Sequence, residues 1–128
     1  MKKVGLWIQK RKAVVVTFIN TKINIHHLID KSRAIPKSTH PFVFKNIHRI
    51  IPINICVQHE EDHFKHIINY LSGAKRILII GPDDTAELFY MHLRNYNKNI
   101  CNSVCNVQHM EHIPVPKIAN YFITYFRQ

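Results

Sequence analysis

A pair of apolar runs on either side of a short basic turn constrains the fold of this chain more than any other feature. One run covers residues 4–8, the other covers residues 13–18, and between them lie Gln9, Lys10, Arg11 and Lys12. Two apolar runs around a short polar turn predict a β-hairpin. Further along, residues 77–80 are continuously apolar, which is typical of a strand covered on both faces, and a helical pattern follows them.

The other strands and the last helix follow from the same periodicities. Residues 23–29 alternate only imperfectly between apolar and polar side chains, so we expect this third strand at an edge of the sheet. The last helix begins near Pro116, a residue type favoured in the first turn. The predicted strands lie at about 3–9, 13–19, 23–29 and 76–80 and within 100–107, and the predicted helices lie at about 58–72, 84–96 and 116–126.

Two helices have recognisable ends or faces. The helix at 58–72 carries one apolar stripe at helical spacing, made of Phe64, Ile67, Ile68 and Leu71. Gly73 suits the left-handed residue that ends it. The next helix opens with Asp84 and Glu87, whose D-x-x-E spacing predicts a capping box.

This order of elements predicts one α/β domain. Hairpins join the first three strands, so these are antiparallel, and two α-β units then add parallel strands by right-handed crossovers. The result is a ribonuclease H-like, five-stranded mixed sheet of order 3-2-1-4-5 with flanking helices, in which strands one, four and five are parallel. We expect a single domain over residues 1–128, interrupted by an irregular basic excursion at about 31–55.

Two stretches carry a resemblance to a known family. The first is Val4-Gly-Leu-Trp-Ile8 followed after the basic turn by Ala13-Val-Val-Val16, and the second is Ile79-Ile-Gly-Pro82 followed by a helix with Glu87-Leu88. In this order they resemble bacterial proteins related to the central domain, domain 2, of archaeal and eukaryotic peptide-chain release factors and of Pelota. The resemblance implies a release-factor-like fold and a role near translation.

The chain departs from that family at its catalytic motif. Release factors carry Gly-Gly-Gln on a mobile loop, whereas the glycines here are the unpaired Gly5, Gly73 and Gly81. Many bacterial relatives also have an acidic residue where Gln9 stands. We therefore expect no peptidyl-tRNA hydrolysis by the release-factor route and, more broadly, a protein that is not an autonomous enzyme and needs no cofactor.

A ribonuclease H-like nuclease is the catalytic alternative. It needs clustered carboxylates that hold two metal ions, and the first of these normally lies on strand one, which here has none. Glu60 or Glu61 and Asp83 or Asp84 offer only two further sites. The sequence therefore disfavours a nuclease without removing it from consideration.

Four residues near the end of the chain have side chains that bind zinc in other proteins: Cys101, Cys105, His109 and His112. Placed on one extended strand, the two cysteines would be ~13 Å apart along the strand. That separation is too large for one zinc ion unless the strand breaks. Core cysteines and loop histidines are therefore the favoured interpretation, and no metal is expected.

Charge indicates the class of partner. The chain has 18 Lys and Arg against 8 Asp and Glu, a formal charge of +10, which favours polyanion partners, RNA first and an anionic membrane second. The alternative is a basic surface with no dedicated partner. Two basic clusters are candidates for RNA binding: Lys2, Lys3, Lys10, Arg11 and Lys12 at the start and the first turn, and Lys31, Arg33, Lys37, Lys45 and Arg49 in the excursion. On one side of the fold they would form a phosphate-contacting surface; otherwise they are two separate solvated patches.

The leading hypothesis is a non-catalytic, translation-associated protein that binds the ribosome, rRNA or tRNA. The alternative is a protein-interaction or self-assembly module, with a homo-oligomer formed through the strand at 23–29, and the third is the nuclease. We expect a cytoplasmic location with reduced cysteines, because residues 1–8 resemble no secretory signal. We expect no membrane association, because no apolar stretch approaches the ~20 residues of a membrane span.

Overall fold

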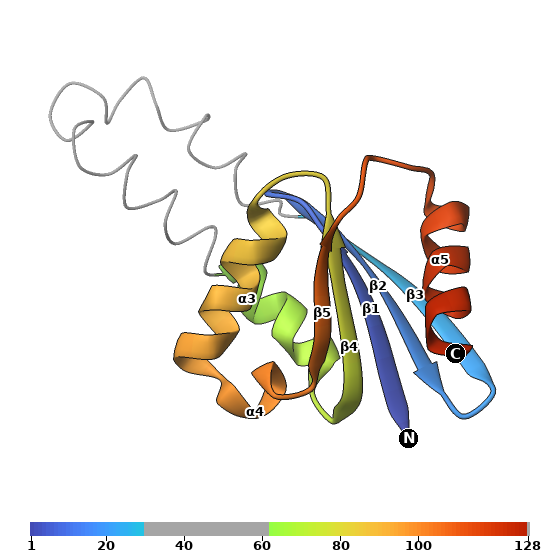
Figure 1. The fold of residues 1–128 in the computed structure, drawn as a ribbon, viewed down its shortest axis with the longest axis horizontal. Coiled ribbons are helices and arrows are strands. Elements are labelled where there is room, and N and C mark those ends of the chain that lie inside the picture. The colour runs from blue at the N-terminus through green and yellow to red at the C-terminus, as the bar shows by residue number, and fades with distance from the viewer. Residues whose placement is uncertain (30–61, 128) are drawn as a thin grey trace, which may run out of the picture.

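A five-stranded mixed sheet forms the centre of the structure, which is a computed structural model and describes residues 1–29 and 62–127 (Figure 1). The strand order is β3-β2-β1-β4-β5, which confirms the predicted order. The strands are β1 (Lys2–Ile8), β2 (Lys12–Ile19), β3 (Lys22–Ile29), β4 (Ala74–Gly81) and β5 (Val104–His109).

The strand directions also agree with the prediction. β1 pairs antiparallel with β2 and β2 antiparallel with β3, whereas β1, β4 and β5 are parallel. The apolar β4 lies between β1 and β5, and β3 is an edge strand, as its weak alternation predicted. The register places Trp7 opposite Val14 in the hairpin and beside Ile80 in β4, so these three side chains share one face.

The helices begin and end close to the predicted residues, with one addition. They are a helix over 62–71, α3 (Thr85–Tyr96), α4 (Lys98–Cys101) and α5 (Val115–Arg127). Residues 58–61, which the prediction included in the first helix, lie outside the described part of the chain. The single turn α4 was not predicted; the Asn97 side chain accepts a hydrogen bond from the Ile100 amide at its start. Because α4 occupies residues 98–101, β5 begins only at Val104.

The helices cover the two faces of the sheet unequally. The helix at 62–71 and α3 lie on one face and α5 lies on the other (Figure 1). The chain crosses from β3 to the parallel β4 and then from β4 to the parallel β5, and both crossovers run in the same direction across the sheet. Right-handed crossovers therefore place both connecting helices on the same face. The second face receives only the terminal helix.

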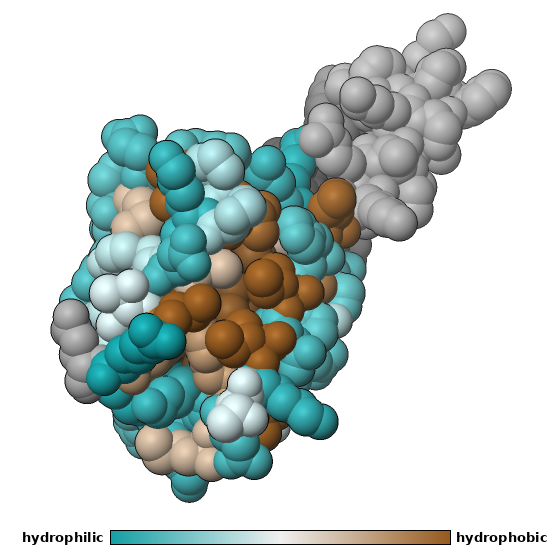
Figure 2. Space-filling view, turned by 90° about the vertical axis from the view of Figure 1, so that its right-hand side faces the viewer, coloured by the Kyte–Doolittle hydropathy of each residue, from teal (hydrophilic) through white to brown (hydrophobic). Residues whose placement is uncertain are grey.

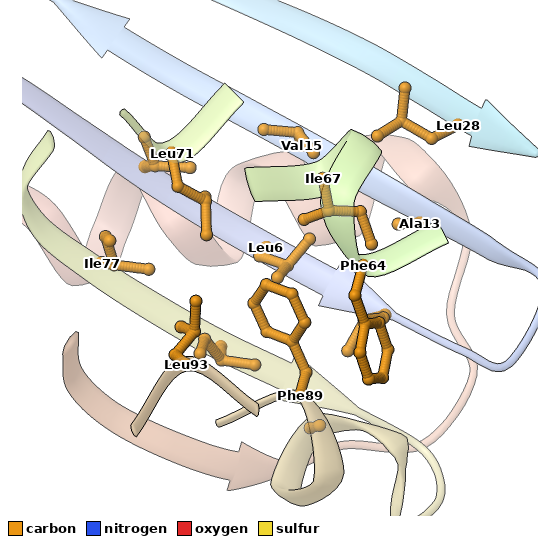
Figure 3. Packing of buried hydrophobic residues seen from close by; sticks show 14 of the residues in the cluster. Leu6, Ala13, Val15, Leu28, Phe64, Ile67, Leu71, Ile77, Phe89 and Leu93 are labelled. Carbon is orange, nitrogen blue, oxygen red and sulfur yellow. The ribbon is translucent and has the colours of Figure 1, made fainter. Parts of the chain in front are cut away.

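The larger core lies under the two helices (Figure 3). Leu6 from β1 and Ile77 from β4 meet Phe64, Ile67 and Leu71 of the helix at 62–71. These three side chains are buried, which confirms most of the predicted stripe. The ring of Phe64 also packs edge to face on α3, against Phe89, with ring centroids 5.1 Å apart.

The smaller core lies under α5. Its strand residues include the fully buried Val16, Leu78 and Ile80, and α5 contributes Ile118, Ala119, Phe122 and Phe126. At its centre the Phe122 ring lies directly on the backbone of β1, where the residue is Gly5. A Cβ atom at Gly5 would come within 2.2 Å of the ring, so the absence of a side chain permits this approach.

The predicted helix ends are partly confirmed. Gly73 has φ +82°, the left-handed conformation expected of a helix terminator. The capping prediction for α3 named the wrong residue. Asp84 occupies the N-cap position but its side chain makes no cap hydrogen bond, and instead Asp83 Oδ1 accepts from the Thr85 amide at 2.9 Å. No helix in the described ranges is both long and apolar enough to cross a membrane.

Candidate nucleic-acid interface

The basic turn between β1 and β2 is the most prominent part of the candidate interface. Lys10, Arg11 and Lys12 are all exposed, and none of them forms an ion pair within residues 1–29 and 62–127. The Gln9 amide donates to the Lys12 carbonyl at 2.8 Å, which closes the turn and fixes its backbone. Three adjacent cations are thus presented at the end of a hydrogen-bonded hairpin.

Lys2 and Lys3 lie at the opposite end of β1 from this turn. Lys3 and Lys10 are seven residues apart along an extended strand, a separation of about 23 Å. Lys2 Nζ donates to the Ser72 carbonyl at 2.9 Å, and Lys3 Nζ donates to the Phe126 carbonyl at 3.4 Å. Each lysine therefore lies at the C-terminal end of a helix, where the helix dipole favours a cation. The structure does not bring this pair together with the turn.

The second predicted cluster lies in a segment that the structure does not describe. Its members are Lys31, Arg33, Lys37, Lys45 and Arg49, all between the described ranges 1–29 and 62–127. Whether the two clusters form one surface therefore stays a prediction.

The loops that follow β4 and β5 carry carboxylates at the same edge of the sheet as the end of β1, because the three strands are parallel. A Cβ atom at Gly81, the last residue of β4, would be 2.5 Å from the Ile8 carbonyl oxygen at the end of β1. The loop after Gly81 contains Asp83, whose carboxylate caps α3. Glu111, after β5, lies 3.8 Å from the His109 ring nitrogen Nε2. Asp83 thus has a hydrogen-bond partner in the fold, whereas Glu111 is highly exposed and Asp84 makes no cap hydrogen bond.

These carboxylates do not form the metal-binding site that a nuclease would need. β1 carries no carboxylate along Lys2–Ile8. In the described ranges no three His, Cys, Asp or Glu side chains come together in a way that could hold a metal ion. Glu60 and Glu61 lie outside the described residues, so their part in the nuclease hypothesis stays a prediction.

The four candidate zinc ligands, Cys101, Cys105, His109 and His112, lie in different surroundings. Cys101 belongs to α4 and not to β5, so the expected separation of two cysteines along one strand was wrong. Cys105 contacts the Ser103 carbonyl at 3.9 Å, and His109 faces Glu111. The His112 ring stands edge-on to Trp7, with ring centroids 5.2 Å apart. Cys105, His109 and His112 thus each make a separate local contact, and Cys101 lies in a different element.

Sequence reasoning missed one arrangement, a cation at the start of β4. The Arg76 guanidinium lies 5.9 Å from the centroid of the Tyr125 ring and 5.5 Å from that of Phe126, so it packs on the last turns of α5. A hydrogen bond with Cys105 raises the pKa of Arg76 further. The alternation of side chains in β4 offered a signal, because Arg76 shares its face with Leu78 and Ile80, which α5 covers.

Comparison with known proteins identifies the fold. No protein-family model matches the sequence, and no curated protein is significantly similar to it. Solved structures do match: Pelota of Thermoplasma acidophilum has 13% sequence identity and a TM-score of 0.58 over 97% of this chain and 32% of that chain. Pelota of Archaeoglobus fulgidus has 11% identity and a TM-score of 0.59 over 96% and 31%. The archaeal translation termination factor aRF1 has 9% identity and a TM-score of 0.54 over 98% and 39%.

These values describe a shared architecture. This chain spans about a third of the length of the three structures, so its fold corresponds to one part of each of them. At such low identity the likeness shows the fold alone, because one fold supports many functions. It agrees with the expected architecture, five strands in the order 3-2-1-4-5 with flanking helices.

Proposed function

We propose that this chain is a non-catalytic, translation-associated protein of the cytoplasm that binds the ribosome or tRNA through backbone phosphates. The observation that carries the proposal is the exposed turn Lys10–Arg11–Lys12, which has no ion-pair partner in the described structure. It is supported by the fold, which is similar to parts of Pelota and of a protein described as an archaeal translation termination factor.

Phosphate contact is the chemistry that this turn suits best. Lysine ammonium and arginine guanidinium groups bind phosphate oxygens by charge-assisted hydrogen bonds, and arginine can do so with two parallel bonds. The turn contains no aromatic side chain on which a base could stack, so its contacts would carry no sequence information. The formal charge of +10 adds long-range attraction toward a polyanion.

Several features support a binding protein over an enzyme. The sequence has no Gly-Gly-Gln, and β1 has no carboxylate. Asp83, a candidate metal ligand of the nuclease hypothesis, accepts a hydrogen bond from the first turn of α3. Binding through the turn requires none of these groups.

A second candidate function is self-association through the edge strand β3. The outer edge of β3 pairs with no other strand of the described sheet, and such an edge is a template for another chain. Under this alternative the protein would form a homo-oligomer and would not bind RNA.

Sedimentation with ribosomes across a salt series tests the leading proposal. If three cations of the turn each neutralise one phosphate, the logarithm of affinity falls with the logarithm of salt with a slope of about −2 to −2.7. Between 50 and 200 mM salt this slope weakens binding by about 20- to 40-fold. Changing Lys10, Arg11 and Lys12 to Ala should remove that part of the slope.

A matched variant distinguishes binding by the turn from a general effect of net charge. Changing Lys65, Arg94 and Lys98 to Ala removes the same charge from exposed helical positions elsewhere on the fold. We expect this variant to keep the salt slope, with both variants retaining the wild-type circular dichroism spectrum. Equal losses in the two variants would reduce the proposal to a net-charge effect. Absence of co-sedimentation at low salt, together with stable dimers in light scattering, would replace it with self-association.

A further inference from the structure

The face of the sheet under α5 is too wide for one helix to cover. A helix with its side chains is about 10–12 Å across, whereas strands are about 4.8 Å apart. One helix therefore covers two or three of the five strands. The α5 core includes Val14 and Val16 of β2, Trp7 of β1 and Ile80 of β4, so both edge strands extend beyond it.

The two edge strands differ sharply on this face. β5 presents Asn106 and Gln108, which lie opposite Leu78 and Ile80 in the register, and Tyr121 donates a hydrogen bond to Gln108. β3 presents mainly apolar side chains on this face: Ile23 at 47% exposure, Ile25 at 44% and Ile29 at 63%, with the exposed His27 between the last two. The uncovered part of β5 is therefore polar and can face solvent, whereas the uncovered part of β3 is mainly apolar.

A hollow borders each end of this exposed row. Ile23 lines one of about 380 Å³ together with Phe18, Ile123 and Phe126. Ile29 lines another of about 300 Å³ together with Val14, Val115 and Ile118. Both lie between the strands and α5. We call the three isoleucines with these two hollows the isoleucine face. Figure 2, which views the side where α5 lies, shows hydrophobic residues gathered there with hydrophilic residues around them.

The charged residues at the border of the isoleucine face are basic. Lys3 and Arg127 line the first hollow, and Lys12 lines the second. No Asp or Glu occurs among the described residues that line either hollow. An apolar strip between cations complements an apolar strip between carboxylates.

We propose that the isoleucine face binds an amphipathic helix of a partner protein, with an apolar stripe flanked by Asp and Glu. The helix would lie beside α5 and cover β3. Ile23 and Ile29 are six residues apart, about 20 Å along the strand, which corresponds to a helix of about 13 residues. This surface is separate from the proposed ribosome or tRNA contact, apart from Lys12, which borders both.

The geometry favours a helix over a strand or a second copy of this chain. A strand added to the edge of β3 would pair with its backbone but would leave the isoleucine side chains on the face uncovered. Only an element that lies over the face buries them. A second copy carries the same formal charge of +10, so its approach to a basic border is opposed by repulsion. RNA would leave the apolar side chains against phosphate and sugar.

A designed peptide tests the proposal directly. The probe is a fluorescein-labelled helical peptide of about 14 residues, with leucines at i, i+3, i+4 and i+7 flanked by glutamates, and binding is read by fluorescence anisotropy. A second peptide has every glutamate replaced by lysine. We expect the acidic peptide to bind on the order of tenfold more tightly than the basic one, with NMR shift changes on β3 and α5.

Paired variants locate the site on the protein. Ile23→Thr with Ile25→Thr keeps β-branched residues in the strand and should weaken binding of the acidic peptide on the order of tenfold. The control is Leu88→Gln with Met91→Gln on α3, which removes similarly exposed apolar side chains, at 40% and 45%, and should change nothing. Arg127→Glu should also weaken binding.

Three results would overturn the proposal. The first is equal affinity for the acidic and basic peptides, and the second is unchanged binding by the isoleucine variant. The third is a wild-type dimer in sedimentation velocity that Ile23→Thr with Ile25→Thr converts to monomer, which would assign the face to a second copy. The Lys10→Ala, Arg11→Ala variant, tested in parallel, should bind the peptide normally. Loss of ribosome binding in that variant alone therefore leaves this proposal intact.

Discussion

Replacing Gly5 by alanine tests how closely α5 packs on the sheet. The added Cβ would lie 2.2 Å from Cγ of Phe122 and 2.4 Å from both of its Cδ atoms. Ordinary carbon contacts need about 3.5 Å or more, so the whole ring must lift from β1. Phe122 is fully buried, and the ring therefore cannot move aside into solvent.

The expected loss of stability follows from two opposing effects. Forcing a methyl group into a packed core costs about 1–3 kcal/mol. Alanine is favoured over glycine inside a strand by about 0.5–1 kcal/mol, which offsets part of that cost. A net loss of about 1–2 kcal/mol in the free energy of unfolding remains. For a chain of 128 residues this corresponds to a fall in Tm of about 4–8 °C.

Urea unfolding followed by circular dichroism measures this loss, and a second substitution tests its cause. Phe122→Leu shortens the side chain over Gly5, so Gly5→Ala should cost less in that background than in the wild type. The difference is a coupling energy between two residues in contact. A Gly5→Ala protein as stable as the wild type, or an equal cost in both backgrounds, would refute the close packing of Phe122 on β1.

Three further predictions concern the start of α3, the end of β4 and the phenol of Tyr90. Asp83→Ala should lower the free energy of unfolding by about 0.5–2 kcal/mol, and Asp84→Ala should lower it less, because only the Asp83 side chain caps α3. Urea unfolding of the two variants measures the difference. Gly81→Ala should destabilise the folded state more than Gly5→Ala, because its Cβ would lie 2.5 Å from a backbone oxygen, which cannot move aside as a side chain can. Thermal unfolding of the two variants ranks these losses. The hydrogen bond with Cys101 raises the pKa of Tyr90 above 10.0, so the folded state favours the neutral phenol. The resulting stability is present below pH 10 and is lost as the pH rises through the folded pKa, and Cys101→Ala should lower that pKa in an ultraviolet titration.

The architecture was predictable because it depends on periodicity and handedness. Alternation and turn chemistry predict the hairpins, and right-handed crossovers then allow few sheet orders. The helix at 62–71 was recognisable because Phe64, Ile67 and Leu71 share one face over a long segment. α4 was missed because a single turn of four residues, Lys98–Cys101, is too short to show a helical period. The choice between Asp83 and Asp84 as the capping side chain depends on loop geometry that neighbouring residues in sequence do not reveal.

The residues of the candidate interface could be predicted from the sequence, but their arrangement in space could not. The basic turn was visible directly, since Lys10, Arg11 and Lys12 are adjacent in the sequence. Lys2 and Lys3 lie at the other end of β1 from that turn, because a seven-residue strand separates the two sets by its full length. Sequence proximity misleads along an extended chain, where each residue adds about 3.3 Å. Residues in register, such as Lys3 and Arg76, are instead neighbours despite their distance in the sequence.

The unequal cover of the sheet follows from the order of its elements. Both crossovers move in the same direction, so both place their helices on one face, and only α5 remains for the other. Gly5 on β1 admits the Phe122 ring, which holds α5 over the centre of the sheet and away from β3. An isolated domain with this topology would be expected to make both uncovered edges polar, as β5 does with Asn106 and Gln108. The isoleucines of β3 depart from that expectation, and a docked helix would restore the missing cover.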